Sequence, residues 1–316
     1  MKTIYLHIGL GKTGTTLIQL HMSNYHSEYL KNGLRYIQCA GGMEGVGHQN
    51  FAKSFIREIP EYMDIPKSVM VSRIEVANEL VSCSEKIILL SSENFPLAPP
   101  LEIKEFFVGL NKDYKIKIIL FVRTQDELAE SEYNQIIKVR QEKRSFSSYI
   151  QSEFDGNFMN LASKWEDAFG KDNLICCVYK ASKSSVIEDF FDCFPIDIEA
   201  FNPKDKIVRT FQNESLGIFA LSIKRMVNIL TTDKIRNKHI ELSKSVLDLV
   251  ELNDYPALMM DSKQAKNFRK RYKKSNIQFS KRYLGKKMAD LGGHRYKDNE
   301  RDDIIKVVDQ FTDIRN

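Results

Sequence analysis

Residues 3–16 read TIYLHIGLGKTGTT, and this stretch decides the fold. Thr3–Ile8 is a short apolar run, and a helical pattern begins near Thr15 and continues to about Leu30. Three further runs are equally compact and rich in Ile, Leu and Val, namely Lys86–Leu90, Ile116–Val122 and Leu174–Tyr179. Apolar runs of this kind are typical of parallel strands that are buried on both faces. Because they alternate with helical segments, we predict an α/β fold with a P-loop-like, doubly wound parallel sheet flanked by helices.

The loop between the first strand and the first helix has the composition of an anion site. Small residues from Gly9 to Gly14 let backbone N–H groups converge, and the helix N-terminus adds the positive end of its dipole. Lys12 supplies a cation, while Thr15 and Thr16 supply hydroxyl donors and are expected to cap the first turn. A tight turn with a capping Thr is the simpler alternative. The Lys-Thr-Gly-Thr-Thr order directly after a strand favours phosphate binding.

Two common nucleotide motifs fit this loop less well. A Walker A loop has Lys directly after its second Gly, whereas here Thr15 follows Gly14 and Lys12 lies inside the loop. The dinucleotide pattern G-x-G-x-x-G matches Gly9, Gly11 and Gly14, but no acidic residue ends a second strand at the spacing that ribose binding requires. An ATPase, a GTPase and a dinucleotide enzyme are therefore disfavoured.

The remaining sequence predicts one core and an added helical part. The chain has 316 residues, of which 42% are hydrophobic and 28% charged, as is usual for a globular protein. Past residue 194 the strand signal ends, so we divide the chain into a core at 1–195 and a C-terminal helical part at 196–316. The expected helices outside the sheet pattern are Glu44–Ser82, Glu214–Leu230, Ile240–Leu252, Ser262–Tyr272 and Asp302–Phe311.

Cysteines and hydropathy indicate a cytoplasmic protein. The five cysteines, an odd number, have no metal-ligand spacing. The apolar run Ile4–Leu10 is interrupted by His7 and is followed by no cleavage site, which disfavours a signal peptide. No stretch approaches the ~20 apolar residues of a membrane helix, so we expect no stable membrane insertion.

The segment Leu10–Thr16 resembles the 5′-phosphosulfate loop of sulfotransferases that use 3′-phosphoadenosine 5′-phosphosulfate (PAPS), whose usual form is Pro-Lys-Ser/Thr-Gly-Thr-Thr. Gly11 stands where the family has Pro. The resemblance implies donor contacts from Gly11, Lys12, Thr13, Gly14, Thr15 and Thr16. It also implies a P-loop-like fold, adenosine 3′,5′-bisphosphate as product and no requirement for a metal.

A second stretch resembles the family's 3′-phosphate site, which consists of an Arg at a strand end and a Ser on the next helix. Arg123 follows the strand Ile116–Val122, and Ser131 lies within two turns of a helix start near Gln125. The alternative is an Arg paired to Asp126 or Glu127. In cytosolic relatives a Tyr at the end of a later strand packs against adenine, which makes Tyr179 the adenine candidate.

The resemblance leaves two candidates for the base that accepts the proton of the acceptor. Glu93 follows the strand Lys86–Leu90, and carbohydrate sulfotransferases often use a Glu. His48 lies in a Gly-rich loop, and other sulfotransferases use His. We favour Glu93 and retain His48 as the alternative. Lys12 is expected to stabilise charge on the leaving phosphate, and His7 is interpreted as a satisfied buried group.

The segment Ser131–Lys138 resembles bacterial sulfotransferases that act on glycans, which implies a carbohydrate or other hydroxyl-bearing acceptor. A basic segment, Lys263–Lys287, is either a solvated helix face or a surface for an anionic acceptor. The net charge of +5 is mild and no nucleic-acid module is present, so we expect no nucleic-acid partner. The other functions considered are a small-molecule or nucleotide kinase and a non-catalytic nucleotide- or glycan-binding relative. The oligomeric state is left open.

Overall fold

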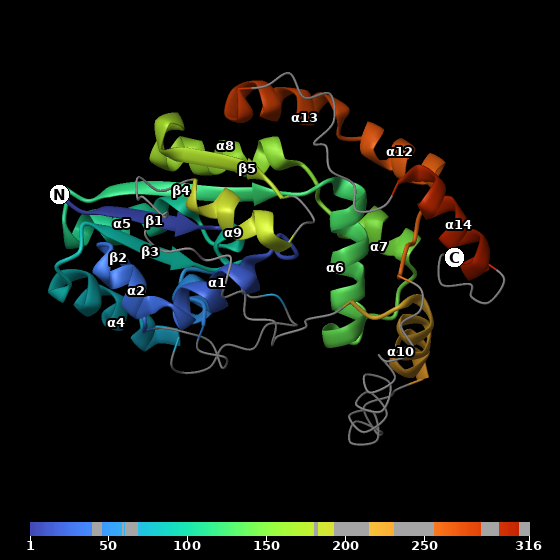
Figure 1. Ribbon diagram of the computed structural model, residues 1–316, viewed down its shortest axis with the longest axis horizontal. Helices are drawn as coiled ribbons and strands as arrows, with labels where there is room; N and C mark the ends of the chain where they lie inside the picture. Colours follow the sequence, from blue (N-terminus) through green and yellow to red (C-terminus); the bar gives the residue numbers. More distant parts are fainter. Residues whose placement is uncertain are drawn as a thin grey trace. The chain divides into compact units, whose positions relative to one another are not determined.

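The computed structural model describes residues 1–39, 46–58, 60, 69–179, 183–192, 215–230, 256–285 and 297–309 (Figure 1). The chain divides into two compact units that interleave along the sequence. Unit 1 comprises Met1–Arg123, Asn157–Thr210 and Ser275–Gly293, and unit 2 comprises Thr124–Gly156, Phe211–Lys274 and His294–Asn316. The domain boundary expected at residue 195 lies outside the described residues and stays a prediction.

Unit 1 contains a five-stranded parallel sheet in the order β2-β3-β1-β4-β5. Its strands are β1 (Thr3–His7), β2 (Leu34–Tyr36), β3 (Ile87–Ser91), β4 (Lys115–Val122) and β5 (Leu174–Val178). The four strands expected from the sequence are confirmed to within a residue at each end. The short edge strand β2 was not predicted, because three residues are too few to establish a pattern.

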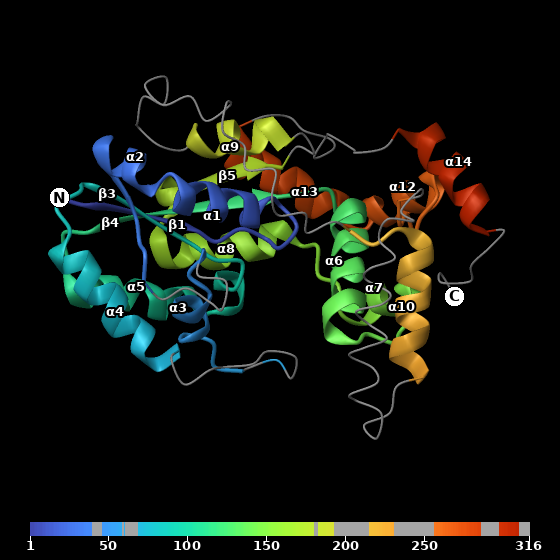
Figure 2. The ribbon, with the colours of Figure 1, turned by 60° about the horizontal axis from the view of Figure 1, so that its bottom comes forward.

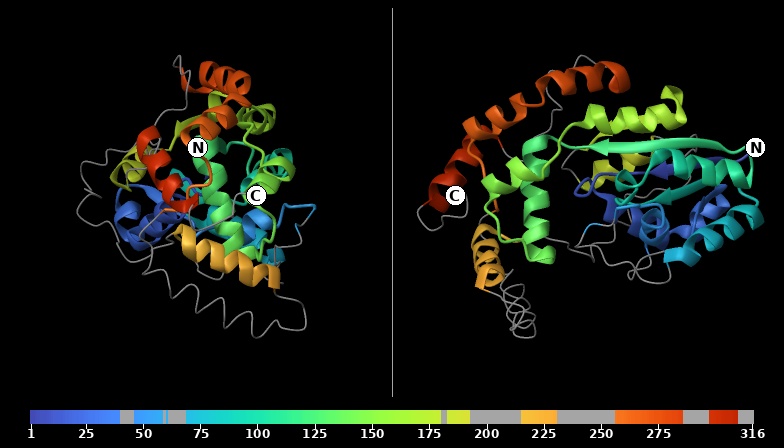
Figure 3. Two further views of the ribbon diagram at one scale, coloured as in Figure 1. Left: turned by 90° about the vertical axis from the view of Figure 1, so that its right-hand side faces the viewer. Right: turned by 180° about the vertical axis from the view of Figure 1, so that it is seen from behind.

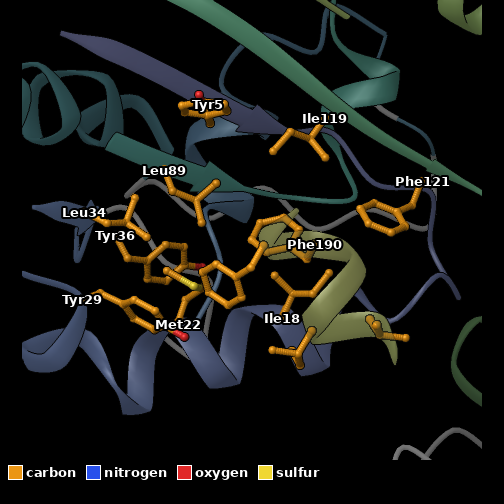
Figure 4. Packing of buried hydrophobic residues seen from close by; sticks show 13 residues of the cluster. Tyr5, Ile18, Met22, Tyr29, Leu34, Tyr36, Leu89, Ile119, Phe121 and Phe190 are labelled. Atoms are coloured by element: carbon orange, nitrogen blue, oxygen red, sulfur yellow. The ribbon is translucent and has the colours of Figure 1, made fainter. Parts of the chain in front are cut away.

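One face of the sheet is covered by α1 (Thr15–Asn24), α2 (His26–Lys31) and α9 (Lys183–Phe191) (Figure 2). Tyr5 and Leu89 are register partners on β1 and β3 and belong to the buried cluster on this face. Ile18 from α1 and Phe190 from α9 belong to the same cluster (Figure 4). The single helix expected over residues 15–30 is thus two short helices.

The other face is covered by α5 (Pro100–Leu110) and α8 (Phe158–Phe169), which contact each other (Figure 2). Aromatic side chains dominate here, with Phe107 and Trp165 buried. The helices α3 (Gln49–Lys53) and α4 (Val69–Ser82) lie within the expected helical region, whose residues 61–68 are not described. Helices on both faces of a parallel sheet confirm the predicted fold class.

The described part of unit 1 also contains three short helical connections. They are η1 (Phe95–Leu97), η2 (Lys171–Asn173) and the π-helical turn η6 (Ser280–Leu284). Arg282 in η6 forms an ion pair with Glu166 of α8. The C-terminal part of the sequence thus contributes to the sheet-bearing unit.

In unit 2 the described elements are helices, and the longest of them is α6 (Gln125–Arg140) (Figure 3). Its other helices are α7 (Phe146–Ser152), α10 (Ile218–Leu230), α12 (Ser262–Lys270) and α14 (Asp298–Asp309), and the unit boundary falls within α13 (Lys273–Phe279). The predicted C-terminal helices correspond to α10, α12 and α14, while Ile240–Leu252 lies outside the described residues. Over the described ranges, no helix has both the length and the apolarity needed to cross a bilayer.

A buried cluster of charged side chains joins three helices of unit 2. On α6, Asp126 is paired with Arg269 of α12 and Glu130 with Arg301 of α14. Glu130 is 5% exposed and Arg301 is 3% exposed, so both charges are removed from water. Such pairs stabilise a fold only when their hydrogen bonds are complete.

Candidate functional site

The candidate site lies in unit 1, at the carboxyl ends of the parallel strands. β1 is the point at which the strand order reverses, with β3 on one side and β4 on the other. Ligands of open α/β sheets bind at such a switch point, outside the carboxyl ends of the strands. The loops after β1, β3, β4 and β5 carry most of the predicted site residues.

The loop after β1 has an unusual backbone. Lys12 has φ 65° and Gly14 has φ 83°, so both are in the left-handed region. For a residue with a side chain, this conformation costs about 1–2 kcal/mol. Such strain is concentrated at functional sites, and in Lys12 it accompanies a side chain suited to phosphate.

Two hydroxyl groups hold the loop together. Thr13 Oγ1 donates to the carbonyl of Leu10 at 2.6 Å, and Thr15 Oγ1 donates to the same carbonyl at 3.2 Å. Gly14 is the N-cap of α1 and has no side-chain cap. The expectation that Thr15 and Thr16 cap the first turn is therefore wrong, because they are the first two residues of the helix itself.

Glycine is needed at some loop positions and not at others. A Cβ on Gly14 would lie 2.7 Å from Val186 Cγ1 and 3.3 Å from Tyr179 Cε2, in addition to the strain of its positive φ. A Cβ on Gly11 would meet no atom of the described residues within 4 Å. Position 11 therefore has room for a side chain, in contrast to position 14.

The structure brings Lys12, Arg123 and Tyr179 together. Arg123 Nη1 donates to the carbonyl of Lys12 at 3.1 Å, across 111 positions of sequence. The Arg123 guanidinium also lies over the Tyr179 ring, 5.3 Å from its centroid, and Tyr179 N–H donates to Val122 at 2.7 Å. The two predicted motifs and the predicted adenine residue therefore meet at one edge of the sheet.

His7, at the end of β1, is buried beneath this loop. Its Nδ1 lies 2.8 Å from Ser91 Oγ, whereas its Nε2 has no hydrogen-bond partner among the described residues. A Cβ on Gly9 would lie 2.8 Å from His7 Nε2 and 2.7 Å from Thr15 Oγ1. Burial lowers the pKa of His7 to about 3, so its ring is neutral. The interpretation of His7 as a satisfied group holds for one of its two nitrogens.

Glu93 lies beyond the end of β3 and is held by a residue that sequence reasoning missed. Gln19 of α1 donates through Nε2 to Glu93 Oε2 at 3.4 Å, to Ser91 Oγ at 3.2 Å and to the Ser91 carbonyl at 3.3 Å. The sequence signal that could have identified Gln19 is its spacing, because it is a polar residue one helical turn after Thr15 on the same face of α1.

His48 is fully engaged by backbone groups. Its Nε2 donates to the Ile37 carbonyl at 2.8 Å, and its Nδ1 accepts from the Ser91 N–H at 3.0 Å. Burial lowers the pKa of His48 to about 4, although these backbone contacts oppose the shift. The ring thus connects the end of β2 with the end of β3.

The remaining predicted residues lie elsewhere. Ser131 is a partly buried residue of α6 in unit 2, and Asp126 of the same helix is paired with Arg269. In the basic segment, Lys266 is paired with Asp298 and Arg282 with Glu166. Residues 286–287 lie outside the described part. Some of the segment's charges therefore serve as ion pairs within their own unit.

The described part of the chain contains no group of three or more His, Cys, Asp or Glu side chains placed to hold a metal ion. The expectation that no metal is required stays a prediction.

No protein-family model matches the chain, and no curated protein matches it. Among solved structures, it resembles a sulfotransferase from Alicyclobacillus acidocaldarius with a TM-score of 0.39 and 13% identity. That match covers 80% of this chain and 95% of the other. A similarity at this level is too remote to assign an activity.

Proposed function

We propose that the chain is a sulfotransferase that takes a sulfuryl group from PAPS and transfers it to a hydroxyl or amine of a carbohydrate-type acceptor. The observation that carries the proposal is the hydrogen bond from Arg123 to the Lys12 carbonyl. This hydrogen bond supports the proposal because a strand-end guanidinium and a phosphate-type loop lie side by side, and the two suit the separate phosphates of an adenosine 3′,5′-bisphosphate.

The residues at this edge fit such a nucleotide. The loop contains a strained Lys and leads into a helix end without a side-chain cap, and beneath it lies a buried His nitrogen without a partner among the described residues. Backbone N–H groups and the helix dipole suit the 5′-phosphate end. Arg123 suits the 3′-phosphate, and the neighbouring Tyr179 offers a ring for adenine. Ser131 is retained as a proposed further 3′-phosphate ligand.

PAPS would supply a sulfuryl group already activated by a phosphate leaving group. The chain then has to hold the phosphate, orient the acceptor and accept its proton. We assign Lys12 to the negative charge on the phosphate, with help from the Thr15 and Thr16 hydroxyls.

We assign the proton-accepting role to Glu93 and not to His48. The Glu93 carboxylate is partly exposed at the sheet edge and is oriented by Gln19. Both nitrogens of His48 are occupied by backbone groups, so the ring cannot take a proton without breaking one of these bonds. His48 is therefore proposed as a structural tie.

Calorimetric titration with adenosine 3′,5′-bisphosphate in the presence of EDTA tests the donor site. We expect the wild type to bind without a divalent metal and Lys12→Ala to lose about 10- to 100-fold in affinity, as for a charge-assisted hydrogen bond. Lys112→Ala, at an exposed position outside the loop, is the matched control and should bind as the wild type does. ATP binding that requires Mg²⁺, without binding of the bisphosphate, would contradict the proposal and favour a kinase.

A transfer assay over a panel of hydroxyl and amine acceptors tests the chemistry. With the acceptor that is found, Glu93→Gln should lower kcat by about 10²- to 10⁴-fold while the affinity for adenosine 3′,5′-bisphosphate stays within about twofold. Tight binding of the bisphosphate with no transfer to any acceptor would instead indicate a non-catalytic relative.

A further inference from the structure

A series of hydrogen-bonded side chains leads from Glu93 to the underside of the phosphate loop. Gln19 Nε2 contacts Glu93 Oε2 and Ser91 Oγ, and Ser91 Oγ contacts His7 Nδ1 at 2.8 Å. His7 and Ser91 are register partners on β1 and β3, and both are fully buried. These hydrogen bonds therefore link His7 to Glu93 through the interior of unit 1.

Donor and acceptor chemistry determines where the hydrogen atoms lie. The Glu93 carboxylate and the Ser91 carbonyl can only accept, so the Gln19 atom that contacts both must be its amide nitrogen. Ser91 Oγ therefore accepts from Gln19 and uses its own hydrogen to donate to His7 Nδ1. A neutral imidazole that accepts at Nδ1 carries its hydrogen on Nε2.

That Nε2 hydrogen is directed at the loop and lacks an acceptor there. His7 Nε2 and Thr15 Oγ1 lie within 2.8 Å of the same point, the position of a Cβ on Gly9. Thr15 Oγ1, which donates to the Leu10 carbonyl, has lone pairs that could accept, but it forms no hydrogen bond with His7 Nε2 in this structure. A fully buried N–H without an acceptor is rare and costly, which points to a partner that becomes available when the loop is filled.

We infer that His7 is a positioning residue of the loop, which donates from Nε2 to Thr15 Oγ1 when the Thr15 side chain turns from Leu10 to a bound phosphate-type anion and brings its oxygen within reach of the ring. The identity of that anion as the end of an adenosine bisphosphate rests on the proposed function. The bond forms only in the filled loop, so it tightens binding. A neutral hydrogen bond of ordinary strength corresponds to about 3- to 10-fold in affinity.

Two substitutions separate the nitrogens of His7. In His7→Asn, the side-chain amide reaches the position of Nδ1 and retains the contact with Ser91, but leaves nothing at Nε2. In His7→Gln, the amide nitrogen reaches the position of Nε2 and retains a donor to the loop. For calorimetry with adenosine 3′,5′-bisphosphate and with inorganic pyrophosphate, we expect His7→Asn to weaken binding about 10-fold and His7→Gln to stay within about threefold of wild type.

A double-mutant cycle with Thr15→Val removes the proposed acceptor. In that background His7→Asn should have no further effect on affinity, because the two side chains act through one bond. Equal weakening by His7→Asn and His7→Gln, or additive effects of His7→Asn and Thr15→Val, would overturn the inference and leave His7 a purely structural residue. Thermal unfolding without ligand confirms that each variant is folded.

The ring nitrogens provide a readout that is independent of affinity. In ¹⁵N NMR of the wild type we expect the Nε2–H tautomer of His7, and addition of either probe should shift Nε2 much more than Nδ1. The Nδ1–H tautomer would overturn the inference. Binding of pyrophosphate but not of the nucleotide would defeat the proposed function while the pyrophosphate arm still decides the role of His7. If neither probe binds, both fail.

Discussion

Both units bury polar side chains, but the Glu130 carboxylate of unit 2 and the His7 ring of unit 1 differ in how many hydrogen-bond partners they have. In unit 2 the Glu130 carboxylate accepts from the N–H groups of Met259 and Met260 at 2.9 and 3.1 Å and from Arg301 at 2.7 Å. In unit 1 the His7 ring is bonded at Nδ1, and its Nε2 faces the loop without a partner in the described part of the chain. An incomplete buried group is not by itself a ligand site, because Arg301 Nη2 in the unit 2 cluster also lacks a hydrogen-bond partner among the described residues. The His7 nitrogen differs in its place, because it lies beside the loop, close to the position that a Cβ on Gly9 would take.

The same contrast separates the two histidines that contact Ser91. His48 uses both nitrogens on backbone groups, and His7 uses one on the Ser91 side chain. Both rings are buried and neutral, so burial and pKa do not distinguish them. The number of satisfied nitrogens does.

The largest expected effect tests the unit 2 side of this comparison. Arg301→Met would leave the Glu130 carboxylate buried with its cation removed, and we expect the free energy of unfolding to fall by about 3–5 kcal/mol. Urea unfolding at pH 7 measures it. A loss below about 1 kcal/mol would show that the pair is not a structural element.

The pH dependence of this variant has a definite sign. Burial raises the pKa of Glu130 even beside Arg301, and removing Arg301 raises it further. The folded variant then binds a proton that the unfolded chain releases, so its deficit relative to wild type should shrink between pH 7 and pH 5. The double variant Glu130→Gln/Arg301→Met should be more stable than Arg301→Met alone, because it buries no unpaired charge.

A glycine pair tests the loop side. Gly9→Ala would place a Cβ 2.7 Å from Thr15 Oγ1 and 2.8 Å from His7 Nε2, so we expect a loss of about 1–3 kcal/mol in unfolding free energy and weaker anion binding. Gly11→Ala is the matched control, since nothing lies within 4 Å of its Cβ. It should be neutral or stabilising by up to about 1 kcal/mol. Equal effects of the two substitutions would argue against the close approach of His7.

The pH dependence of stability tests whether burial lowers the pKa of His7 in the folded protein. Its pKa is about 3 in the folded chain against an ordinary 6.5, so below pH 6.5 the unfolded chain binds a proton that the folded chain does not. Stability is therefore lost as pH falls, by about 1.4 kcal/mol per pH unit for this group. In urea unfolding between pH 6.5 and 4, His7→Gln should reduce the slope by about that amount. An unchanged slope would mean that His7 titrates normally.

Much of the unit 1 fold was predictable because its signals are local. Each long strand is a compact apolar run, and the loop of Lys12 follows one of them directly. Arg123 and Tyr179 were named by two further resemblances, to a 3′-phosphate site and to an adenine-contacting Tyr, and the fold brings both residues to the same edge as the loop. The interleaved units were not predictable, because contacts between distant segments such as α6 and α14 leave no periodic pattern.

The hydrogen-bond partners of the two histidines could not be predicted from the sequence, for a physical reason. A Gly-rich loop suggests an exposed histidine, yet His48 is captured by the Ile37 carbonyl and the Ser91 backbone. A histidine in a strand suggests a satisfied core residue, yet the Nε2 of His7 has no partner among the described residues. Sequence identifies which donors and acceptors exist, whereas their pairing depends on where the chain returns.

The smallest expected effect comes from an exposed pair that joins α12 and α14, two of the three helices of the buried cluster. Lys266 of α12 lies 2.7 Å from Asp298 of α14, with side chains 57% and 53% exposed. Lys266→Ala should change the free energy of unfolding by less than about 0.5 kcal/mol at low salt and by nothing measurable in 1 M NaCl. Arg301→Met breaks a buried pair between α14 and α6, whereas Lys266→Ala breaks an exposed pair between α14 and α12, so the two variants compare a buried with an exposed ion pair of α14. A loss above 1 kcal/mol that persists in high salt would mean that burial does not separate structural pairs from incidental ones in unit 2, and the contrast with His7 would lose its reference.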